Sequence, residues 1–294
     1  MNCICDLMVT VPLPTFHFKF ANFILSEILF CFYILSTVFY YVNEKYFEKN
    51  LIVGGWMKAV ILAAGKGTRM KEITKEIPKP MVMIKGKPML EHIITFLQYA
   101  GITDFGIVVG YKQSVVQDYF GDGSSRGITI TYIDQAVQNG TGSALHLAKD
   151  YVGREPFIFT FGDVITLREN YRGMLDYFNS GSCGGVLGLN RVDDPYRGAA
   201  VYIDDDCNII RMVEKPPQGT STTNLNNSGI MVLGNNIFKY TARLSLSPRE
   251  EYELTDIFGM LQADGHVLKG YILSGYWKDV GTALDLEAAN SLLY

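Results

Sequence analysis

A run of small residues and glycines follows an apolar stretch that begins at residue 57. The sequence reads MKAVILAAGKGTRM over residues 57–70. Small side chains and glycines let the backbone approach a phosphate closely and point its amide hydrogens at the phosphate oxygens. A guanidinium such as that of Arg69 adds a planar fork for the same group. The pattern predicts a phosphate-binding loop, whose small residues are Ala63, Ala64, Gly65, Gly67 and Thr68.

Two familiar phosphate loops do not fit this stretch. The dinucleotide fingerprint needs a third glycine at a position that, counted from Gly65, falls on Met70. A P-loop has lysine directly after its second glycine, whereas Lys66 precedes Gly67 here. A tight turn without a ligand is the alternative that these residues alone leave open.

A carboxylate ends the strongly apolar stretch PFIFTFGD, residues 156–163. Open α/β sheets bind their ligands outside the carboxyl ends of the strands. Asp163 is therefore a candidate for contact with a ligand.

Apolar runs alternate with amphipathic segments in the first half of the body. The expected strands cover residues 59–63, 105–110, 129–134 and 156–163. The expected helices cover residues 88–101, about 112–120, and 141–152. Pro88 and Gly101 mark the start and the end of the first of these helices. This alternation predicts a parallel sheet with right-handed crossovers in a doubly wound α/β fold.

The pattern changes after residue 185. VLGLNR, AAVYID, IIRMVEKP and SGIMVLG look like strands with few helices between them, and helices return over 254–265 and 282–293. We expect these strands to extend the sheet and to build a lid or a substrate side. No internal repeat is visible, so residues 57–294 are interpreted as one unit.

Charge and composition exclude two classes of protein. The 26 basic and 30 acidic residues give a formal charge of −4, which argues against a general nucleic-acid binder. Apolar residues make up 48% of the chain and charged residues 19%, which excludes a mainly disordered chain.

Residues 1–56 are interpreted as a hydrophobic leader that precedes the body. Residues 20–42 are apolar and long enough to cross a bilayer, although Glu27 is costly within a span. The equal alternative is a start-site artefact, with translation beginning at Met57. We expect a cytoplasmic enzyme, tethered to a membrane only if the helix over 20–42 is real, with Cys183 and Cys207 as reduced thiols.

The stretch LAAGKGTRM, followed by PKPM at residues 78–81, resembles the signature of the sugar-1-phosphate nucleotidylyltransferases. These enzymes make nucleotide sugars from a nucleoside triphosphate and a sugar 1-phosphate. The resemblance covers residues 57–294 and implies a Rossmann-like, mainly parallel fold with an added β-rich sugar-binding part. It assigns the loop from Ala63 to Arg69 to the triphosphate, and catalytic roles to Arg69 and Lys79.

The resemblance also assigns the base-binding residues. Gln135 precedes Gly140 by five residues and Thr141 follows, as in uridylyl-type members, which implies UTP or dTTP. An amide side chain can both donate to and accept from a uracil edge. Gln138, in the same loop, is the competing candidate.

The metal and the sugar phosphate are assigned in the same way. Asp163 and Asp279, the latter in GYWKDVGT, match the aspartates that hold Mg²⁺, an ion that takes few protein carboxylates and completes its shell with phosphate oxygens. The resemblance assigns the sugar phosphate to Gly198, Glu214, Lys215 and Asn227.

The implied reaction is attack of a sugar 1-phosphate on the α-phosphorus of the nucleotide, with Asp163 as a third catalytic residue. Glucose 1-phosphate is favoured by analogy with short members of the family. The alternatives are a cytidylyltransferase acting on phosphocholine or a similar phosphate, guanylyl transfer to mannose 1-phosphate, and a non-catalytic regulatory subunit. A homo-oligomer is also an open expectation.

Overall fold

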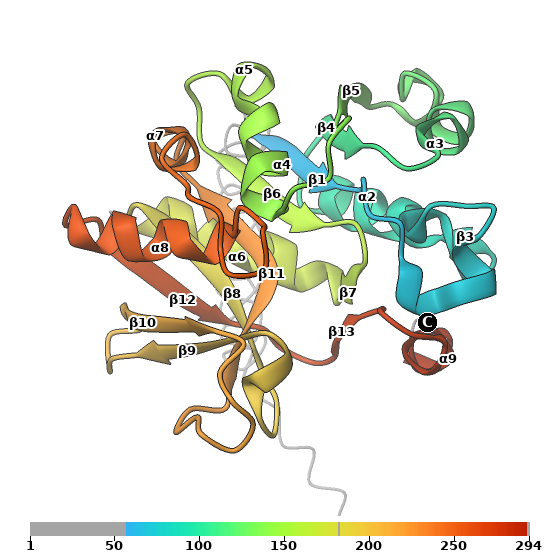
Figure 1. Ribbon diagram of the computed structural model, residues 1–294. Coiled ribbons are helices and arrows are strands. Elements are labelled where there is room, and N and C mark those ends of the chain that lie inside the picture. Colours follow the sequence, from blue (N-terminus) through green and yellow to red (C-terminus); the bar gives the residue numbers. More distant parts are fainter. Residues whose placement is uncertain (1–56, 182, 293–294) are drawn as a thin grey trace, which may run out of the picture. The chain divides into compact units, whose positions relative to one another are not determined.

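Four adjacent parallel strands form one side of a mixed sheet of nine strands (Figure 1). The computed structural model describes residues 57–181 and 183–292, so the predictions for residues 1–56 lie outside the described residues. The sheet order is β10-β9-β11-β6-β1-β4-β5, with β8 added to β11 and β12 added to β8. The group of parallel strands confirms the predicted α/β class.

The central strands are close to the predicted ones. They are β1 (Lys58–Leu62), β4 (Asp104–Val109), β5 (Thr129–Asp134) and β6 (Phe157–Phe161). Short apolar runs form strands here because both faces of the parallel sheet are covered by helices.

The helices of the first half connect these strands. They are α2 (Met89–Tyr99), α3 (Gln113–Phe120), α4 (Thr141–Leu147), α5 (Lys149–Val152) and α6 (Arg168–Ser180). The predicted single helix over 141–152 is interrupted at Ala148, whose amide bonds the carbonyl of Leu145 at 3.0 Å in a tighter turn. Helix α6 was not among the predicted elements.

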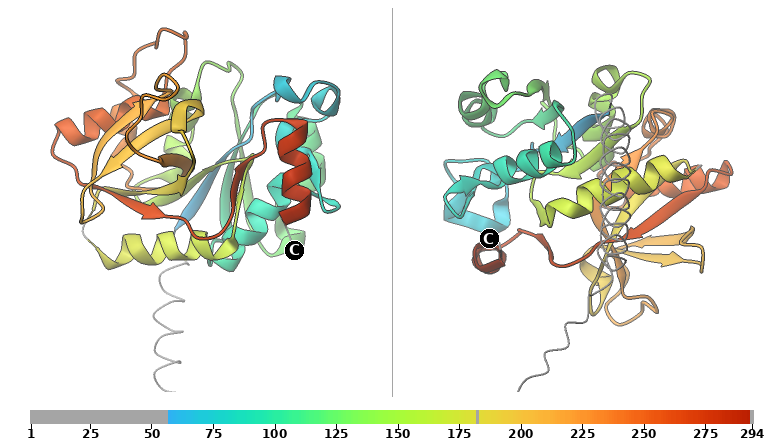
Figure 2. Two further views of the ribbon diagram at one scale, coloured as in Figure 1. Left: turned by 90° about the horizontal axis from the view of Figure 1, so that it is seen from below. Right: turned by 180° about the vertical axis from the view of Figure 1, so that it is seen from behind.

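Alternate residues of β1 point into two separate cores. Ala59 and Ile61 belong to the cluster that α2 and α6 cover, and Val60 belongs to the cluster under α4 and α8. Seen from behind, α2 and α6 lie in front of the sheet (Figure 2). Helices on both faces confirm the doubly wound arrangement.

The second half of the chain adds antiparallel strands, as predicted for the β-rich part. They are β8 (Gly185–Arg191), β9 (Ala199–Ile203), β10 (Ile209–Glu214) and β11 (Leu225–Leu233), followed by β12 (Leu268–Ile272), which runs parallel to β8. The remaining helices are α7 (Ile237–Thr241), α8 (Leu254–Ala263) and α9 (Ala283–Leu292). Because β11 pairs with β6, this half continues the central sheet.

Two small sheets and four short 3₁₀ helices complete the described chain. The sheets pair β7 (Val164–Thr166) with β13 (Trp277–Asp279) and β2 (Met83–Ile84) with β3 (Lys87–Pro88). The 3₁₀ helices are η1 (Thr68–Thr74), η2 (Lys79–Met81), η3 (Ser124–Arg126) and η4 (Pro195–Arg197). Of these elements, η1, η2 and β13 carry predicted site residues, and Asp163 directly precedes β7.

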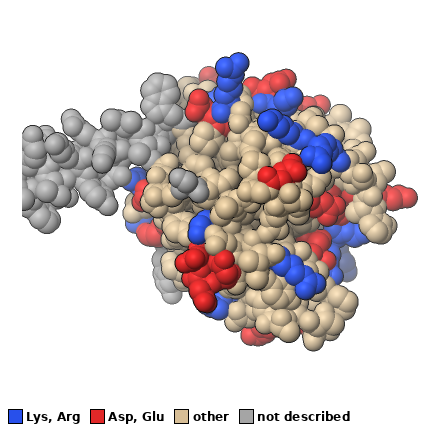
Figure 3. Space-filling view, turned by 90° about the vertical axis from the view of Figure 1, so that its left-hand side faces the viewer, with Lys and Arg blue, Asp and Glu red and all other residues tan. Residues whose placement is uncertain are grey.

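Basic and acidic side chains are interspersed on the face drawn in Figure 3. Within residues 57–181 and 183–292, no helix combines the length and the apolar character needed to cross a bilayer.

Candidate active site

The glycine-rich loop leaves β1 at the carboxyl edge of the parallel strands. Ala63 still bonds the neighbouring strand, its amide donating to the carbonyl of Val108 at 2.8 Å. Gln138 donates to the carbonyl of Ala64 at 2.6 Å. Gly65 is exposed, and a β-carbon added there would meet nothing within 4 Å. The start of the loop is therefore fixed while its middle stays open to a ligand.

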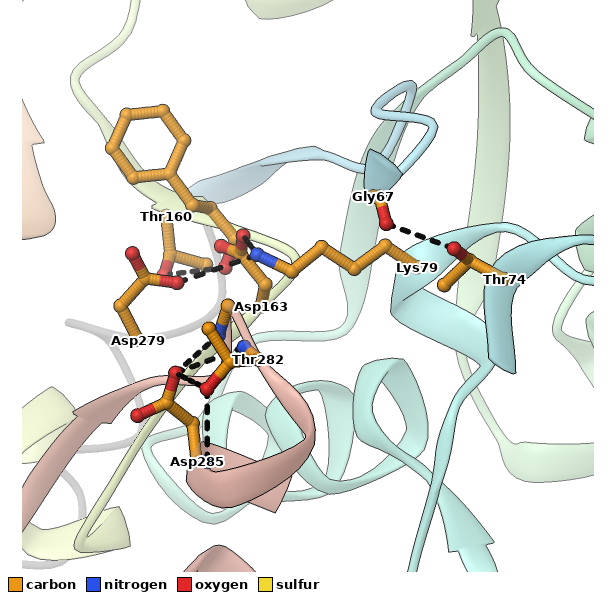
Figure 4. A network of polar contacts seen from close by, with 10 residues as sticks. Gly67, Thr74, Lys79, Thr160, Asp163, Asp279, Thr282 and Asp285 are labelled. Atoms are coloured by element: carbon orange, nitrogen blue, oxygen red, sulfur yellow. Dashed lines mark hydrogen bonds and ion pairs between the residues drawn. The ribbon is translucent and has the colours of Figure 1, made fainter. Parts of the chain in front are cut away.

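Gly67 lets the loop fold back onto Lys79. Its φ of 65° lies in the left-handed region, which glycine adopts without a steric penalty. A β-carbon here would lie 2.8 Å from the β-carbon of Lys79. Thr74 holds the turn by donating to the carbonyl of Gly67 at 2.8 Å (Figure 4). The loop and Lys79 are thus packed as one unit.

Lys79 lies between the two aspartates singled out in the sequence. Its ammonium donates to Asp163 and, at 3.3 Å, to Asp279 (Figure 4). Burial alone lowers the pKa of Lys79, but the two carboxylates outweigh it and raise that pKa above the ordinary value. Burial, with the nearby charge of Asp163, raises the pKa of Asp279. The two aspartates therefore repel each other, and a cation between them relieves the repulsion.

A short antiparallel pairing brings these aspartates together from distant parts of the chain. Asp279 ends β13 and lies opposite Val164, the first residue of β7. The amide of Val280 donates to the carbonyl of Asp163 at 3.0 Å. Backbone pairing rather than side-chain contact alone therefore sets the separation of the two carboxylates.

The carboxylate oxygens around Lys79 suit a magnesium ion as ligands. Mg²⁺ prefers oxygen ligands and is usually held by one or two carboxylates together with substrate phosphates. No cluster of three or more potential metal-binding side chains occurs among the described residues, so a metal at Asp163 and Asp279 would take further ligands from substrate or water. Both carboxylates already approach one cation, the ammonium of Lys79.

Two cavities meet at Asp163. The smaller holds about 310 Å³ and lies beside the glycine-rich loop, and the larger holds about 780 Å³ and lies toward β9, β10 and β11. Residues that line both are Thr141, Phe161, Asp163 and Glu251. A molecule in each cavity could therefore approach the same carboxylate.

The comparisons with known proteins are consistent with this arrangement. The nucleotidyl transferase family model matches residues 58–294, which is most of the chain. The chain belongs to the nucleotidyl transferase family.

Several relatives and solved structures resemble this family member. It is 36% identical over 238 residues to a low-salt glycan biosynthesis nucleotidyltransferase of Haloferax volcanii, covering 81% of this chain and 66% of that one. It is 39% identical over 235 residues to the bifunctional protein GlmU of Methanococcus maripaludis, covering 80% and 54%. The chain thus spans between about half and two thirds of the length of these relatives.

Structural likeness extends over the same part. A Bacillus anthracis protein described as a glucose-1-phosphate thymidylyltransferase, crystallised with sucrose, matches with a TM-score of 0.73 at 33% identity, covering 80% of this chain and 94% of that one. A UDP-glucose pyrophosphorylase bound to UDP-glucose matches with a TM-score of 0.72 at 24% identity, covering 80% and 97%, and shows a shared fold.

In this member of the nucleotidyl transferase family, the residues predicted to bind the nucleotide do not all line the same cavity. Those that line the smaller cavity are Ala64, Gly65, Gln135, Gly140 and Thr141. Arg69 lines the larger cavity instead. Ala63, Gly67 and Thr68 line neither cavity, and Ala63 and Gly67 act through the shape of the loop.

Gln135 and Gln138, the two candidates for contact with the nucleotide base, have different hydrogen-bond partners. Gln135 is buried and its amide reaches only the carbonyl of Gly140, at 3.5 Å. Gln138 is already bonded to Ala64. Both line the smaller cavity, and the weak contact leaves Gln135 the better able to exchange its partner for a ligand.

All four residues predicted for the sugar phosphate line the larger cavity. They are Gly198, Glu214, Lys215 and Asn227. Burial raises the pKa of Glu214 to about 6 despite the nearby positive charge of Arg249. Asn227 accepts from the amide of Gly229 at 3.1 Å, so its side chain also shapes the strand.

Arg249 was missed in the sequence. It pairs with Glu253 at 2.6 Å, approaches Glu214 to 3.6 Å and lines the larger cavity. The stretch SPREEYE is visibly dense in charge. Such stretches usually face solvent, however, and no spacing marks Arg249 out.

Proposed function

We propose that this chain transfers a nucleotidyl group from a nucleoside triphosphate to the phosphate of a sugar 1-phosphate and releases pyrophosphate. One observation carries the proposal: Asp163, paired with Lys79 and next to Asp279, stands on the wall shared by the two cavities. Family membership and the names of the relatives support this reaction class.

The proposed step is an in-line displacement at the α-phosphorus. An oxygen of the sugar phosphate forms a bond to that phosphorus, and the bond from the same phosphorus to the oxygen that bridges the α- and β-phosphates breaks, so that this oxygen leaves with pyrophosphate. The nucleophile is already an anion, so the step needs no general base. Catalysis then depends on holding two anions in line and on offsetting their charge.

The chain's own residues would supply the positioning and part of the positive charge. The loop amides at and around Gly65 would hold the triphosphate in the smaller cavity. The ammonium of Lys79 would move away from the two aspartates and bind phosphate oxygens. Arg69, which lines the larger cavity, would face the triphosphate and the sugar phosphate. Asp163 and Asp279 would hold Mg²⁺, which supplies charge neutralisation and Lewis acidity at the phosphates.

We propose UTP or dTTP as the nucleotide and glucose 1-phosphate as the acceptor. Gln135 in the smaller cavity is suited to a uracil or thymine edge. Glu214 and Lys215 in the larger cavity are suited to sugar hydroxyls and to a phosphate, respectively. We also propose a cytoplasmic location, for which the free thiols of Cys183 and Cys207 offer support.

A pyrophosphate-release screen tests the proposal. It crosses UTP, dTTP, CTP, GTP and ATP with glucose 1-phosphate, other sugar 1-phosphates and phosphocholine, all with Mg²⁺. We expect turnover with UTP or dTTP and a sugar 1-phosphate, and a rate lower by about 10²–10³-fold in the Asp163→Asn variant. Turnover only with CTP and phosphocholine would overturn the proposed acceptor. Nucleotide binding without turnover for any pair would instead indicate a regulatory subunit.

A further inference from the structure

Asp285, in the first turn of α9, accepts hydrogen bonds from the turn that follows Asp279. One of its oxygens accepts from the amide of Gly281 at 3.2 Å, the amide of Thr282 at 2.9 Å and the hydroxyl of Thr282 at 2.7 Å (Figure 4). Its other oxygen pairs with Lys278 at 2.7 Å. One carboxylate thus holds residues on both sides of Asp279.

Part of this pattern is an ordinary helix cap. The hydroxyl of Thr282 accepts from the amide of Asp285 at 3.3 Å, while Asp285 accepts from the amide of Thr282. This reciprocal pair is a capping box with aspartate in the place of glutamate. A cap satisfies the amides at the helix start, and it does not call for the bonds to Gly281 and Lys278.

The same turn also lies against Arg69. Gly281 is buried, and a β-carbon added to it would lie 3.0 to 3.2 Å from atoms of the Arg69 guanidinium. Any side chain at this position would press on the guanidinium. The turn held by Asp285 therefore contacts the arginine of the phosphate loop as well as carrying Asp279.

Helix α9, which carries Asp285, is held in place at two points. Ala289 is fully buried in the core that lies under α2 and α6. Asn290 accepts from the amide of Lys85 at 2.9 Å, in the turn between β2 and β3. The helix is therefore attached to the segment that follows Lys79. Asp285 in turn connects the helix to the turn that follows Asp279.

We propose that Asp285 is a positioning residue, which fixes Asp279 and Arg69 relative to each other for metal and phosphate binding. This inference rests on the proposed function. Groups that orient a metal ligand typically change metal affinity or activity 10–100-fold when they are removed. Asp285 also lines the larger cavity, but its two oxygens are bonded to the turn and to Lys278, so it would act through the turn and not by touching the metal or the substrate.

The test compares Asp285→Ala with a matched control, Asp204→Ala. Asp204 also holds a turn, accepting from the amides of Asp206 and Asn208 and from the side chain of Asn208, and it lines neither cavity. Asp285→Asn and Lys278→Met are added because each removes the ion pair. Asp285→Asn retains a side-chain oxygen that can accept from the backbone amides, and Lys278→Met leaves the cap unchanged. The measurements are thermal stability, kcat, the KM of each substrate, and calorimetric Mn²⁺ affinity in the presence of the nucleotide.

We expect Asp285→Ala to weaken Mn²⁺ binding and to lower kcat, each by about tenfold or more. Asp204→Ala should leave both within about twofold of the wild type while losing similar thermal stability. Asp285→Asn and Lys278→Met should fall between Asp285→Ala and the wild type. If Asp285→Ala lost stability only, as the control does, the positioning role would be refuted. Absence of turnover in the wild type would refute the proposed function, and the Mn²⁺ comparison would still decide on Asp285.

Discussion

The backbone amide of Val280 donates a 3.0 Å hydrogen bond to the carbonyl oxygen of Asp163. This bond extends the pairing of β13 with β7 by one step. It places the carboxylate of Asp163, between β6 and β7, beside the carboxylate of Asp279. The two proposed metal ligands are thus brought together by the pairing of two strands that lie far apart in the sequence.

The first prediction concerns Asp163 itself. Asp163→Asn keeps the size of the side chain and removes its charge, so the fold should persist. The rate of pyrophosphate release should fall by about 10²–10³-fold, the scale of losing one electrostatic contact to a transition state. Steady-state kinetics and circular dichroism check this. Near-normal activity would contradict the role of Asp163 as a metal ligand.

The second prediction concerns the ion pairs of Lys79. Lys79→Met leaves Asp163 and Asp279 close together without their shared cation. We expect a loss of about 2 kcal/mol in the free energy of unfolding, which is below the range for fully buried pairs, because the Asp279 side chain is 43% exposed. Thermal unfolding with and without Mg²⁺ checks this. If the two aspartates form a cation site, Mg²⁺ should stabilise the variant more than the wild type.

The third prediction uses the raised pKa of Glu214, about 6. The protonated form is favoured in the folded state, so its contribution to stability is present below the ordinary value of 4.5 and is lost as pH rises through 6. Binding of sugar hydroxyls by the carboxylate should show the opposite trend. The KM for the sugar phosphate should therefore rise as pH falls through 6.

The control for this pH effect is Glu214→Gln. A sugar phosphate has its own second ionisation near the same pH, so the wild-type profile alone is ambiguous. The ratio of wild-type to variant kcat/KM removes that contribution. It should fall about tenfold between pH 8 and pH 5. A ratio that stays constant over this interval would show that Glu214 does not bind the sugar as a carboxylate.

The fourth prediction contrasts two glycines. A β-carbon at Gly198 would lie 2.1 Å from the side-chain oxygen of Asn226, which is buried and accepts from the amide of Ala199. Gly198→Ala should cost about 1–3 kcal/mol and raise the KM for the sugar phosphate. At the exposed Gly259 in α8 a β-carbon meets nothing within 4 Å, so Gly259→Ala should stabilise by about 0.5–1 kcal/mol. Urea unfolding of both variants decides the comparison.

The fifth prediction separates the two glutamines of the smaller cavity. Gln135→Ala should raise the KM for the preferred nucleotide and flatten the ranking of the five nucleotides. Gln138→Ala removes the bond to Ala64 and should weaken all nucleotides alike, because it loosens the phosphate loop. Competition binding with the five triphosphates measures both rankings. A ranking that changes only in Gln138→Ala would assign base selection to Gln138.

The central strands were predictable because their signal is local. The alternating segment 129–134, for example, becomes a strand with the expected bounds. Helix α6 was missed although Tyr171, Met174 and Leu175 occur at helical spacing, because polar residues outnumber apolar ones in it. The break of the 141–152 helix at Ala148 has no local signal, since alanine favours helices.

The site was predictable as a set of residues and not as an arrangement. Motifs singled out Asp163, Lys79 and Asp279, whereas the pairing of β7 with β13 that joins them depends on contacts distant in the chain. Arg249 carries no motif of its own, and the capping box formed by Thr282 and Asp285 marks the start of a helix without indicating a contact with the site. Their place became visible only through their partners, Glu214 and Lys278.

A transfer experiment with a labelled acceptor tests directly whether the chain joins a nucleotide to a sugar phosphate. Glucose 1-phosphate carrying ³²P is incubated with UTP or dTTP, Mg²⁺ and the protein, and the products are separated by chromatography. We expect the label to move into a nucleotide sugar with the wild type, and to do so about 10²–10³-fold more slowly with Asp163→Asn. Label that remains in the sugar phosphate with every nucleotide and every labelled sugar 1-phosphate tried, or that appears as inorganic phosphate, would contradict this expectation.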